Sequence, residues 1–225
     1  MAGPDSTSWT LIQGAAKGDT ASREEFARRY EPVVRAFLAA RWRGGRLLEE
    51  IDDAVQEAML LCLSPDSPLE HFDRERPGGF RAYLWGVVRN IARSFERELK
   101  KRGFRVPANL EEIPEDDSSL ATVFDRAWAR SLLSQAAALQ RERARAAGGG
   151  AADRRIELLQ LRLEDELPIR EIAARWNEDP DRLHREYARA REDFKHCLFT
   201  VVREHHPGGD AEVEKECLRL VSIFA

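Results

Sequence analysis

The stretch RAYLWGVVRNIARSFERELKKR, residues 81–102, decides the fold class of this chain. Its apolar side chains recur every three or four residues, which is the spacing of one face of an α-helix. The cations Arg89, Arg93, Arg97 and Lys101 repeat every four residues along another face. The stretch therefore predicts a long amphipathic helix that buries one side and carries a stripe of positive charge on the other.

Helical spacing continues on both sides of this stretch, and no useful length of the chain alternates polar with apolar residues as a strand does. We therefore expect an all-α protein. Glycine and proline break the pattern at 44–45, 64–79, 103–119, 148–150 and 207–209. Because residues 103–118 hold two prolines and the acidic run Glu115-Asp116-Asp117, they predict an acidic linker. It would join two small helical domains, residues 1–102 and 119–206, and residues 207–225 predict a C-terminal helical extension that packs on the second domain.

Composition narrows the classes of function. The 225 residues include 36 Lys and Arg against 40 Asp and Glu, a net charge of −4. Since phosphate neutralisation supplies most non-specific affinity for DNA, such a chain is expected to bind free duplex DNA poorly by itself. The three cysteines form no C-x-x-C pair, so we predict no disulfide framework and no metal site. No other cofactor is predicted. The sequence also lacks a Gly-rich phosphate loop, a nucleophile elbow and an H-E-x-x-H motif, so we do not expect an enzyme.

The expected location is the cytoplasm. The longest apolar run, from Ala58 to Leu63, is far shorter than the ~20 residues of a membrane-spanning helix. The first residues lack the basic-then-apolar order of a signal peptide. No membrane partner is therefore predicted.

A second informative helix is predicted over residues 49–63. At about 100° per residue, one face is apolar and the opposite face gathers Glu49, Asp53, Gln56, Glu57 and Leu60. A solvated acidic surface is the simpler interpretation. However, a large aliphatic side chain among carboxylates is typical of a face that docks a basic partner around one apolar anchor.

Phe80, Tyr83 and Trp85 stand at the start of the cationic stripe. Aromatic side chains beside a row of cations are suited to stacking on single-stranded bases. The alternative is a place in the core, which we favour for one of Tyr83 and Trp85.

The second domain contains the outline of a helix-turn-helix. Residues 169–176 predict a short helix, and a turn then leads into a long helix from about Pro180. Asp179 is a suitable N-cap, and proline suits the first helical position. Arg182, Arg185 and Arg189 share one side of the long helix near its start, where a recognition helix contacts base edges. Such three-helix units also serve as protein-docking modules, and that alternative stays open.

The motifs together carry a resemblance. Asp53-Ala-Val-Gln-Glu-Ala-Met-Leu60 and the later run from Phe80 to Arg93 resemble region 2 of bacterial RNA polymerase sigma factors of the extracytoplasmic-function (ECF) type. Ser8-Trp-Thr-Leu-Ile12 and Phe26-Ala-Arg-Arg-Tyr30 are similar to the first helices of that family. The Glu-Ile-Ala at 171–173 and the Arg-Ala-Arg at 189–191 resemble the region 4 helix-turn-helix of the family.

The resemblance implies roles for particular residues. Core RNA polymerase, through the coiled coil of its β′ subunit, would dock on Asp52, Asp53, Gln56, Glu57 and Leu60. The minus-ten promoter element would contact Arg76, Phe80, Tyr83, Trp85, Arg89, Asn90, Arg93 and Arg97. The minus-thirty-five element would contact Arg182, His184, Arg185 and Arg189. Asp181-Arg-Leu-His184 departs from the family pattern, because an acidic residue replaces a small or β-branched one near the phosphates.

The resemblance thus implies an ECF-type sigma factor that binds core polymerase, including its β subunit, and directs promoter recognition and melting in the bacterial cytoplasm. An anti-sigma factor or another regulator is a possible further partner. The alternative is a stand-alone helix-turn-helix regulator, or a helical protein-interaction module, that does not bind polymerase. The acidic face of residues 49–63 discriminates between them, because a stand-alone regulator has no need of it.

Overall fold

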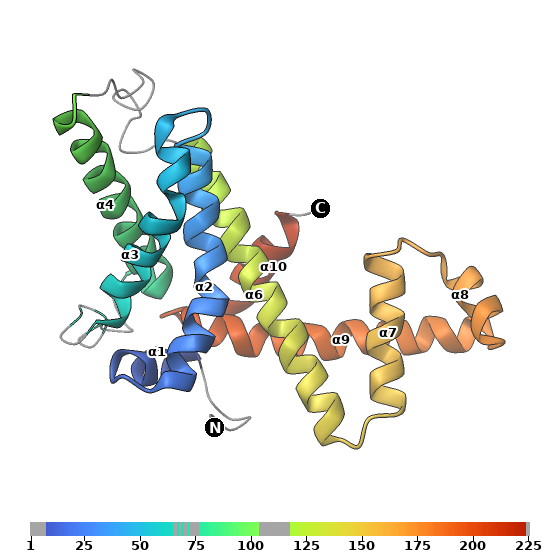
Figure 1. Cartoon of the computed structure of the whole chain (residues 1–225). Helices are drawn as coiled ribbons and strands as arrows, with labels where there is room; N and C mark the ends of the chain where they lie inside the picture. The colour runs from blue at the N-terminus through green and yellow to red at the C-terminus, as the bar shows by residue number, and fades with distance from the viewer. Residues whose placement is uncertain are drawn as a thin grey trace. The chain divides into compact units, whose positions relative to one another are not determined.

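The computed structural model describes residues 8–64, 67, 69, 72, 77–103 and 118–223 (Figure 1). All regular structure in these ranges is helical, which confirms the all-α prediction. The elements are α1 (Ser8–Ala16), α2 (Thr20–Arg41), the 3₁₀ helix η1 (Arg46–Glu50), α3 (Ile51–Leu63), α4 (Gly79–Lys101), α6 (Ser118–Ala146), α7 (Ala151–Leu163), α8 (Ile169–Trp176), α9 (Pro180–His205) and α10 (Asp210–Ser222). Apart from its ends, the predicted linker at 103–118 lies outside the described residues.

Contacts between residues divide the chain into two compact units. The first unit comprises Met1–Leu132 together with Val202–Ala225, and the second comprises Leu133–Val201. Helices α6 and α9 therefore contribute residues to both units. This division differs from the predicted boundaries, because the contacts group the start of α6, the end of α9 and all of α10 with the first unit.

The C-terminal extension belongs to this first unit. Asp210 of α10 pairs with Arg203 at the end of α9, and Arg219 of α10 lies 3.6 Å from a carboxylate oxygen of Asp125 in α6. Arg203 and Asp125 both lie within residues 119–206, the predicted second domain. Contact clustering assigns Arg203, Asp125 and α10 to the first unit, so both of these ion pairs lie within one unit.

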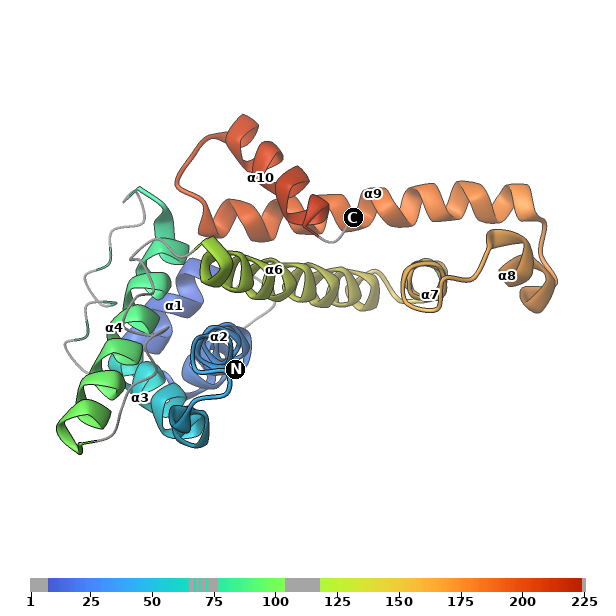
Figure 2. The ribbon, with the colours of Figure 1, turned by 90° about the horizontal axis from the view of Figure 1, so that it is seen from above.

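Helices α2, α3 and α4 pack beside one another in the first unit, with α1 against α2 (Figure 2). Asp19 caps α2, because the Ser22 amide donates a 2.8 Å hydrogen bond to its carboxylate. Hydrogen bonds from the Ser22 side chain and amide hold the pKa of Asp19 below its usual value. Arg23 donates to the backbone oxygens of Ala15 and Leu63, at 3.1 and 2.7 Å. One side chain thus satisfies carbonyl groups at the ends of α1 and α3.

An aromatic cluster around Tyr30 forms the centre of the first unit. Rings from three other helices surround Tyr30, with centroids 4.8 Å away for Phe80 of α4, 5.9 Å for Trp128 of α6 and 6.2 Å for His205 of α9. The buried hydroxyl of Tyr30 lies 2.7 Å from Nε2 of His205. At Gly79 a Cβ would come within 2.6 Å of the His205 carbonyl oxygen, and the residue adopts φ +54°, so glycine is required there.

A buried ion pair joins α2 to α4. The Arg41 guanidinium donates two hydrogen bonds to the Glu96 carboxylate, at 2.6 and 2.9 Å, and the indole N–H of Trp42 donates a third at 3.1 Å. The two charged side chains are only 11% and 10% exposed. With all three donors directed at one carboxylate, the desolvation of both charges is offset by close, bidentate geometry.

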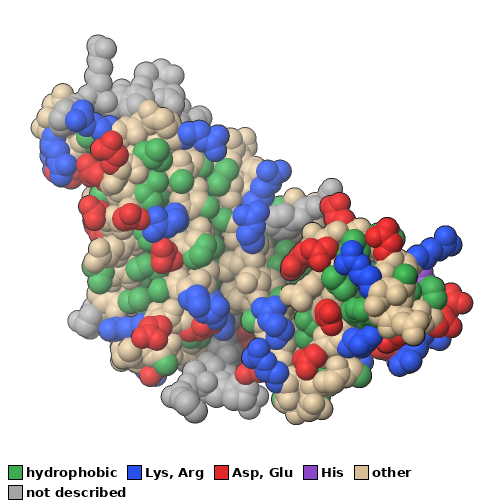
Figure 3. All heavy atoms as spheres, turned by 45° about the vertical axis from the view of Figure 1, so that its right-hand side comes forward, with side chains coloured by type: hydrophobic (Ala, Val, Ile, Leu, Met, Phe, Trp, Pro, Cys, Tyr) green, Lys and Arg blue, Asp and Glu red, His purple; other side chains and the backbone are tan. Residues whose placement is uncertain are grey.

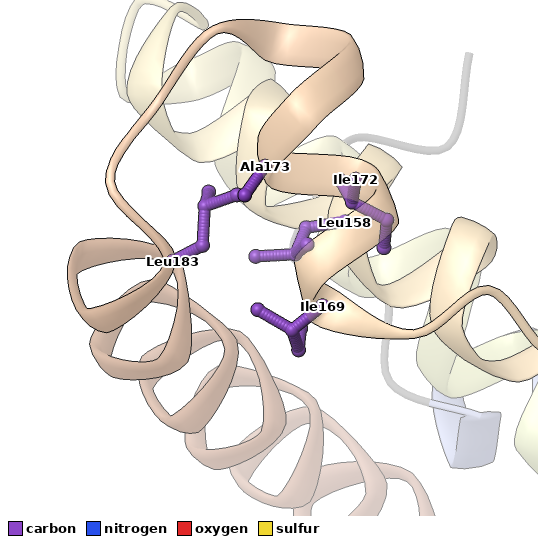
Figure 4. Close-up of a cluster of buried hydrophobic side chains, with 5 residues drawn as sticks. All are labelled: Leu158, Ile169, Ile172, Ala173 and Leu183. Atoms are coloured by element: carbon purple, nitrogen blue, oxygen red, sulfur yellow. The ribbon is translucent and has the colours of Figure 1, made fainter.

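The second unit has its own small core (Figure 4). Leu158 of α7, Ile169, Ile172 and Ala173 of α8, and Leu183 of α9 are buried together. Trp176 and Tyr187 pack against this cluster. Where α6 meets α9, the Gln140 side-chain amide donates to the Ala190 carbonyl oxygen at 3.1 Å. The segments that the sequence assigned to helices around the turn therefore share one apolar cluster.

Glu96→Ala tests the ion pair. The substitution leaves a buried guanidinium and a buried indole N–H without their acceptor, so we expect it to lower the free energy of unfolding by ~3–5 kcal/mol. Urea denaturation followed by circular dichroism measures this change. Glu98→Ala, which removes a solvent-exposed pair with Lys101 on the same helix, should cost ~0.5 kcal/mol or less. Equal losses in the two variants would contradict the interpretation.

Candidate functional site

Helix α3 brings the predicted polymerase-docking residues to one exposed face. Asp52, Asp53, Gln56 and Glu57 are exposed, and Leu60 is 59% exposed beside them. Ile51, Ala54, Val55, Ala58, Met59 and Cys62 are buried on the other side. Leu61, 40% exposed, enlarges the apolar part of this face. The helix thus presents carboxylates and aliphatic side chains to the outside, as its periodicity predicts.

Charge is distributed unevenly over this α3 face. Asp52 accepts a 2.6 Å hydrogen bond from Arg35 of α2, which raises the pKa of that guanidinium. Asp53 and Glu57 have no ion-pair partner within the described ranges. Because uncompensated carboxylates attract a basic partner most strongly, Asp53 and Glu57 carry the charge of this face.

Helix α4 carries the predicted cationic side chains along one side. Arg97 and Asn90 are exposed, and Arg89 and Arg93 are half-buried. Arg97 donates to the Arg93 carbonyl oxygen at 3.2 Å, and Arg89 lies 5.7 Å from the centre of the Trp85 ring. The stripe therefore lies at the surface of the first unit, beside an aromatic side chain.

Phe80 does not lie where the prediction requires. Its side chain is 2% exposed, and its ring contacts Tyr30, Phe26 and Trp128. A base cannot stack on a ring enclosed in this way, so the minus-ten role predicted for Phe80 is wrong for this structure. The sequence pattern could not reveal this, because three of the rings that enclose Phe80 belong to α2 and α6, far away in the chain.

Tyr83 and Trp85 are both half-buried. Burial raises the pKa of the Cys62 thiol to about 12 and raises the pKa of the Tyr83 hydroxyl, and the Tyr83 ring lies 5.3 Å from Phe72. Trp85 packs edge-on between Phe37 and Phe124, with centroids 5.1 and 5.0 Å away. Each ring therefore serves the core on one side and keeps part of its surface accessible. Arg76 lies outside the described residues.

The start of α9 places its predicted site residues on the surface. Arg182, His184, Arg185 and Arg189 are all exposed, and Leu183 between them is buried in the core of the second unit. The Asp179 carboxylate accepts hydrogen bonds from the amides of residues 181 and 182, at 2.6 and 3.4 Å, so Asp179 caps α9 and Pro180 begins it. Both of these local predictions are confirmed.

The turn between α8 and α9 has three residues, 177–179. Asn177 adopts the left-handed conformation, φ 51°, that commonly ends a helix. Arg154 of α7 stacks 4.3 Å from the centre of the Trp176 ring and pairs with Glu178 at 2.7 Å. Contacts from α7 therefore hold the end of α8 and the middle of the turn.

Arg81 and Asp125 were missed by the sequence analysis. Arg81 lies eight residues before Arg89, so it continues the stripe in register, with Trp85 between them. In the structure Arg81 is paired with Asp125 of α6. The four-residue spacing was a signal that could have extended the stripe to Arg81. Nothing in the local sequence could have revealed Asp125, because the contact is long-range.

Three further findings bear on the class of function. None of the described helices is both long and apolar enough to cross a lipid bilayer. In the described ranges, no three His, Cys, Asp or Glu side chains gather where they could hold a metal ion. Positive and negative side chains are interspersed over the face drawn in Figure 3.

Comparison with known proteins adds no family. Neither the scan against protein-family models nor the search of curated proteins finds a match for this chain.

Phe80→Ala separates a core role from a role in DNA contact. Because the ring is fully enclosed, we expect the free energy of unfolding to fall by ~3–5 kcal/mol, the usual cost of truncating a buried phenylalanine. Thermal and urea unfolding measure this loss. Leu60→Ala, which truncates an exposed side chain in the same unit, should change stability by ~0.5 kcal/mol or less. A stable Phe80→Ala protein would contradict the enclosed position.

Proposed function

We propose that this chain is an ECF-type sigma factor, which binds core RNA polymerase and directs promoter recognition and melting. The observation that carries the proposal is the exposed α3 face, where Asp53, Glu57 and Leu60 stand together on a rigid helix of the first unit. Carboxylates around an apolar anchor suit a basic helical partner, which the sequence resemblance identifies as the β′ coiled coil. The β subunit of polymerase is a second expected partner.

The α4 stripe supplies the proposed minus-ten contacts. Arg89, Arg93 and Arg97 would bind phosphates of the promoter, while Asn90 and the accessible parts of Tyr83 and Trp85 would meet its bases. Phe80 is removed from this set, since it supports α4 from the core. The proposed reader is thus an exposed cationic helix face rather than an aromatic cluster.

The second unit supports a minus-thirty-five reader. Helix α8, the turn at 177–179 and the start of α9 have the composition of a helix-turn-helix, with Arg182, His184, Arg185 and Arg189 exposed on the second helix. Arginine is the commonest specific reader of guanine in the major groove. Glu192 and Asp193 follow on the same helix, so these contacts would end within its first turns.

Near-neutral charge fits a protein that acts with polymerase. The net charge is −4, and a chain without a broad cationic field gains little affinity from phosphates alone. Polymerase would supply the remaining contacts and hold the DNA in register. Under this proposal the protein acts in the bacterial cytoplasm, as a non-enzymatic partner of polymerase without a cofactor. An anti-sigma factor is a further partner that the proposal allows.

A stand-alone helix-turn-helix regulator is the second candidate. The exposed arginines at the start of α9 favour it, because they do not depend on polymerase. It gives no role to the aliphatic and acidic face of α3, so we rank it second.

Asp53→Lys tests the proposal. The change reverses a charge on the exposed docking face without touching the core, so we expect co-elution with core RNA polymerase on gel filtration to be lost while the unfolding curve stays unchanged. Glu24→Lys makes the same change of charge at an exposed position of α2, outside that face, and should co-elute normally. Failure of the unmodified chain to co-elute would refute the sigma factor and favour the stand-alone regulator.

A further inference from the structure

The cationic stripe of α4 continues beyond Arg89 as a column in which two rings lie between two cations. Arg89 lies 5.7 Å from the centre of Trp85, Trp85 packs 5.0 Å from Phe124 of α6, and the Arg81 guanidinium lies 5.7 Å from the centre of Phe124. All four side chains belong to the first unit. Rings at this distance fix the plane of a guanidinium and leave its N–H groups to bind anions.

Asp125 stands at the end of this column and holds two arginines. One carboxylate oxygen is paired with Arg81 of α4, and the other lies 3.6 Å from Arg219 of α10. Arg81 and Arg219 are 34% and 42% exposed, so solvent and ions reach both guanidinium groups. Arg219 also pairs with Glu216 of its own helix at 2.6 Å, and its pKa is raised mainly by that contact.

Two guanidinium groups that converge from different helices on one anion define a place where another anion can bind. Two oxygens of a phosphate can accept two N–H bonds from one guanidinium, as the two oxygens of a carboxylate do. The column leads from the proposed promoter contacts directly to Arg81 and Arg219. The anion that we expect to bind there is therefore a backbone phosphate of the promoter DNA strand.

We propose that Arg81 and Arg219 form an extension of the DNA-backbone surface, with Asp125 as a built-in competitor for the phosphate. The C-terminal helix α10 thereby contributes directly to nucleic-acid binding. This inference rests on the proposed function, because the α4 stripe is the proposed promoter contact. When DNA is absent, the Asp125 carboxylate neutralises Arg81 and shares Arg219 with Glu216. When DNA binds, a phosphate replaces that carboxylate.

Competition from Asp125 would explain why the chain by itself binds DNA weakly. Each arginine released from Asp125 adds one phosphate contact, and each contact steepens the dependence of log affinity on log salt by about 0.7 for a single strand. Removal of the Asp125 charge should therefore strengthen binding, whereas loss of an ordinary structural ion pair should leave binding unchanged or weaken it.

Asp125→Asn is the test, measured with the purified full-length chain. Fluorescence anisotropy with a labelled single-stranded oligonucleotide of mixed sequence, over a series of NaCl concentrations, gives affinity and salt slope. We expect affinity to rise about two- to fivefold. The slope should steepen by less than the ~1.4 of two wholly new contacts, because phosphate already displaces the carboxylate part of the time in the unmodified chain. Adding Arg219→Gln to Asp125→Asn should remove about half of the added slope, because one of the two new contacts is lost.

Glu24→Gln is the matched control, since it removes one negative charge at an exposed position outside this site. An equal gain in Glu24→Gln would reduce the effect to net charge and overturn the proposal. So would the absence of any gain in Asp125→Asn, or a gain that Arg219→Gln leaves intact.

Arg81→Gln and Arg219→Gln in the unmodified chain give a second measurement that does not depend on how well Asp125→Asn folds. Each should make the salt slope shallower, and unchanged slopes in both would overturn the proposal. Because the oligonucleotide experiments contain no polymerase, their failure leaves docking through α3 standing. Failure of co-elution with polymerase likewise leaves the phosphate site to be decided by the anisotropy series.

Discussion

The hydrogen bond between Tyr30 and His205 is the contact on which the first unit depends. It joins residues 175 positions apart, inside a cluster of rings from α2, α4, α6 and α9. Burial raises the pKa of the Tyr30 hydroxyl and keeps it protonated. A buried hydroxyl without a partner would be costly, so His205 must be present for this packing to be stable. The end of α9 is therefore part of the first unit rather than an appendage to it.

The position of α4 follows from that cluster. Phe80 is buried among the rings, and the His205 carbonyl oxygen approaches Gly79 too closely for any side chain. Further along the helix, Glu96 is bound to Arg41 and Trp42. With both ends held from the core side, the opposite face of α4 is presented as a rigid row of cations. Rigid elements position binding residues more accurately than loops, which suits the proposed contact with DNA.

The same packing explains how α10 reaches the proposed DNA surface. Once the last turn of α9 is held beside Gly79, the chain has only a short distance to cover before α10 begins at Asp210. Arg219 then lies within reach of Asp125, and Asp125 within reach of Arg81. A segment that looks like an optional extension in the sequence thus supplies a charged side chain to the first unit.

The local sequence pattern was sufficient to predict much of this structure. Helical spacing predicted the all-α class, the exposed face of α3 and the stripe of α4, because burial of one face repeats along a helix. Capping chemistry correctly placed Asp179 and Pro180 at the start of α9. The enclosed position of Phe80, the partners of Asp125 and the grouping of α10 were not predictable. Each depends on a contact between segments far apart in the chain, and such contacts leave no period in the sequence.

Sequencing the 5′ ends of transcripts made in vitro tests the central proposal most directly. Core RNA polymerase would transcribe sheared bacterial genomic DNA with this protein, without it, and with the Asp53→Lys variant. For a sigma factor we expect new 5′ ends that share upstream sequence motifs and that disappear in the variant. The same 5′ ends with and without the protein would contradict a role in promoter recognition.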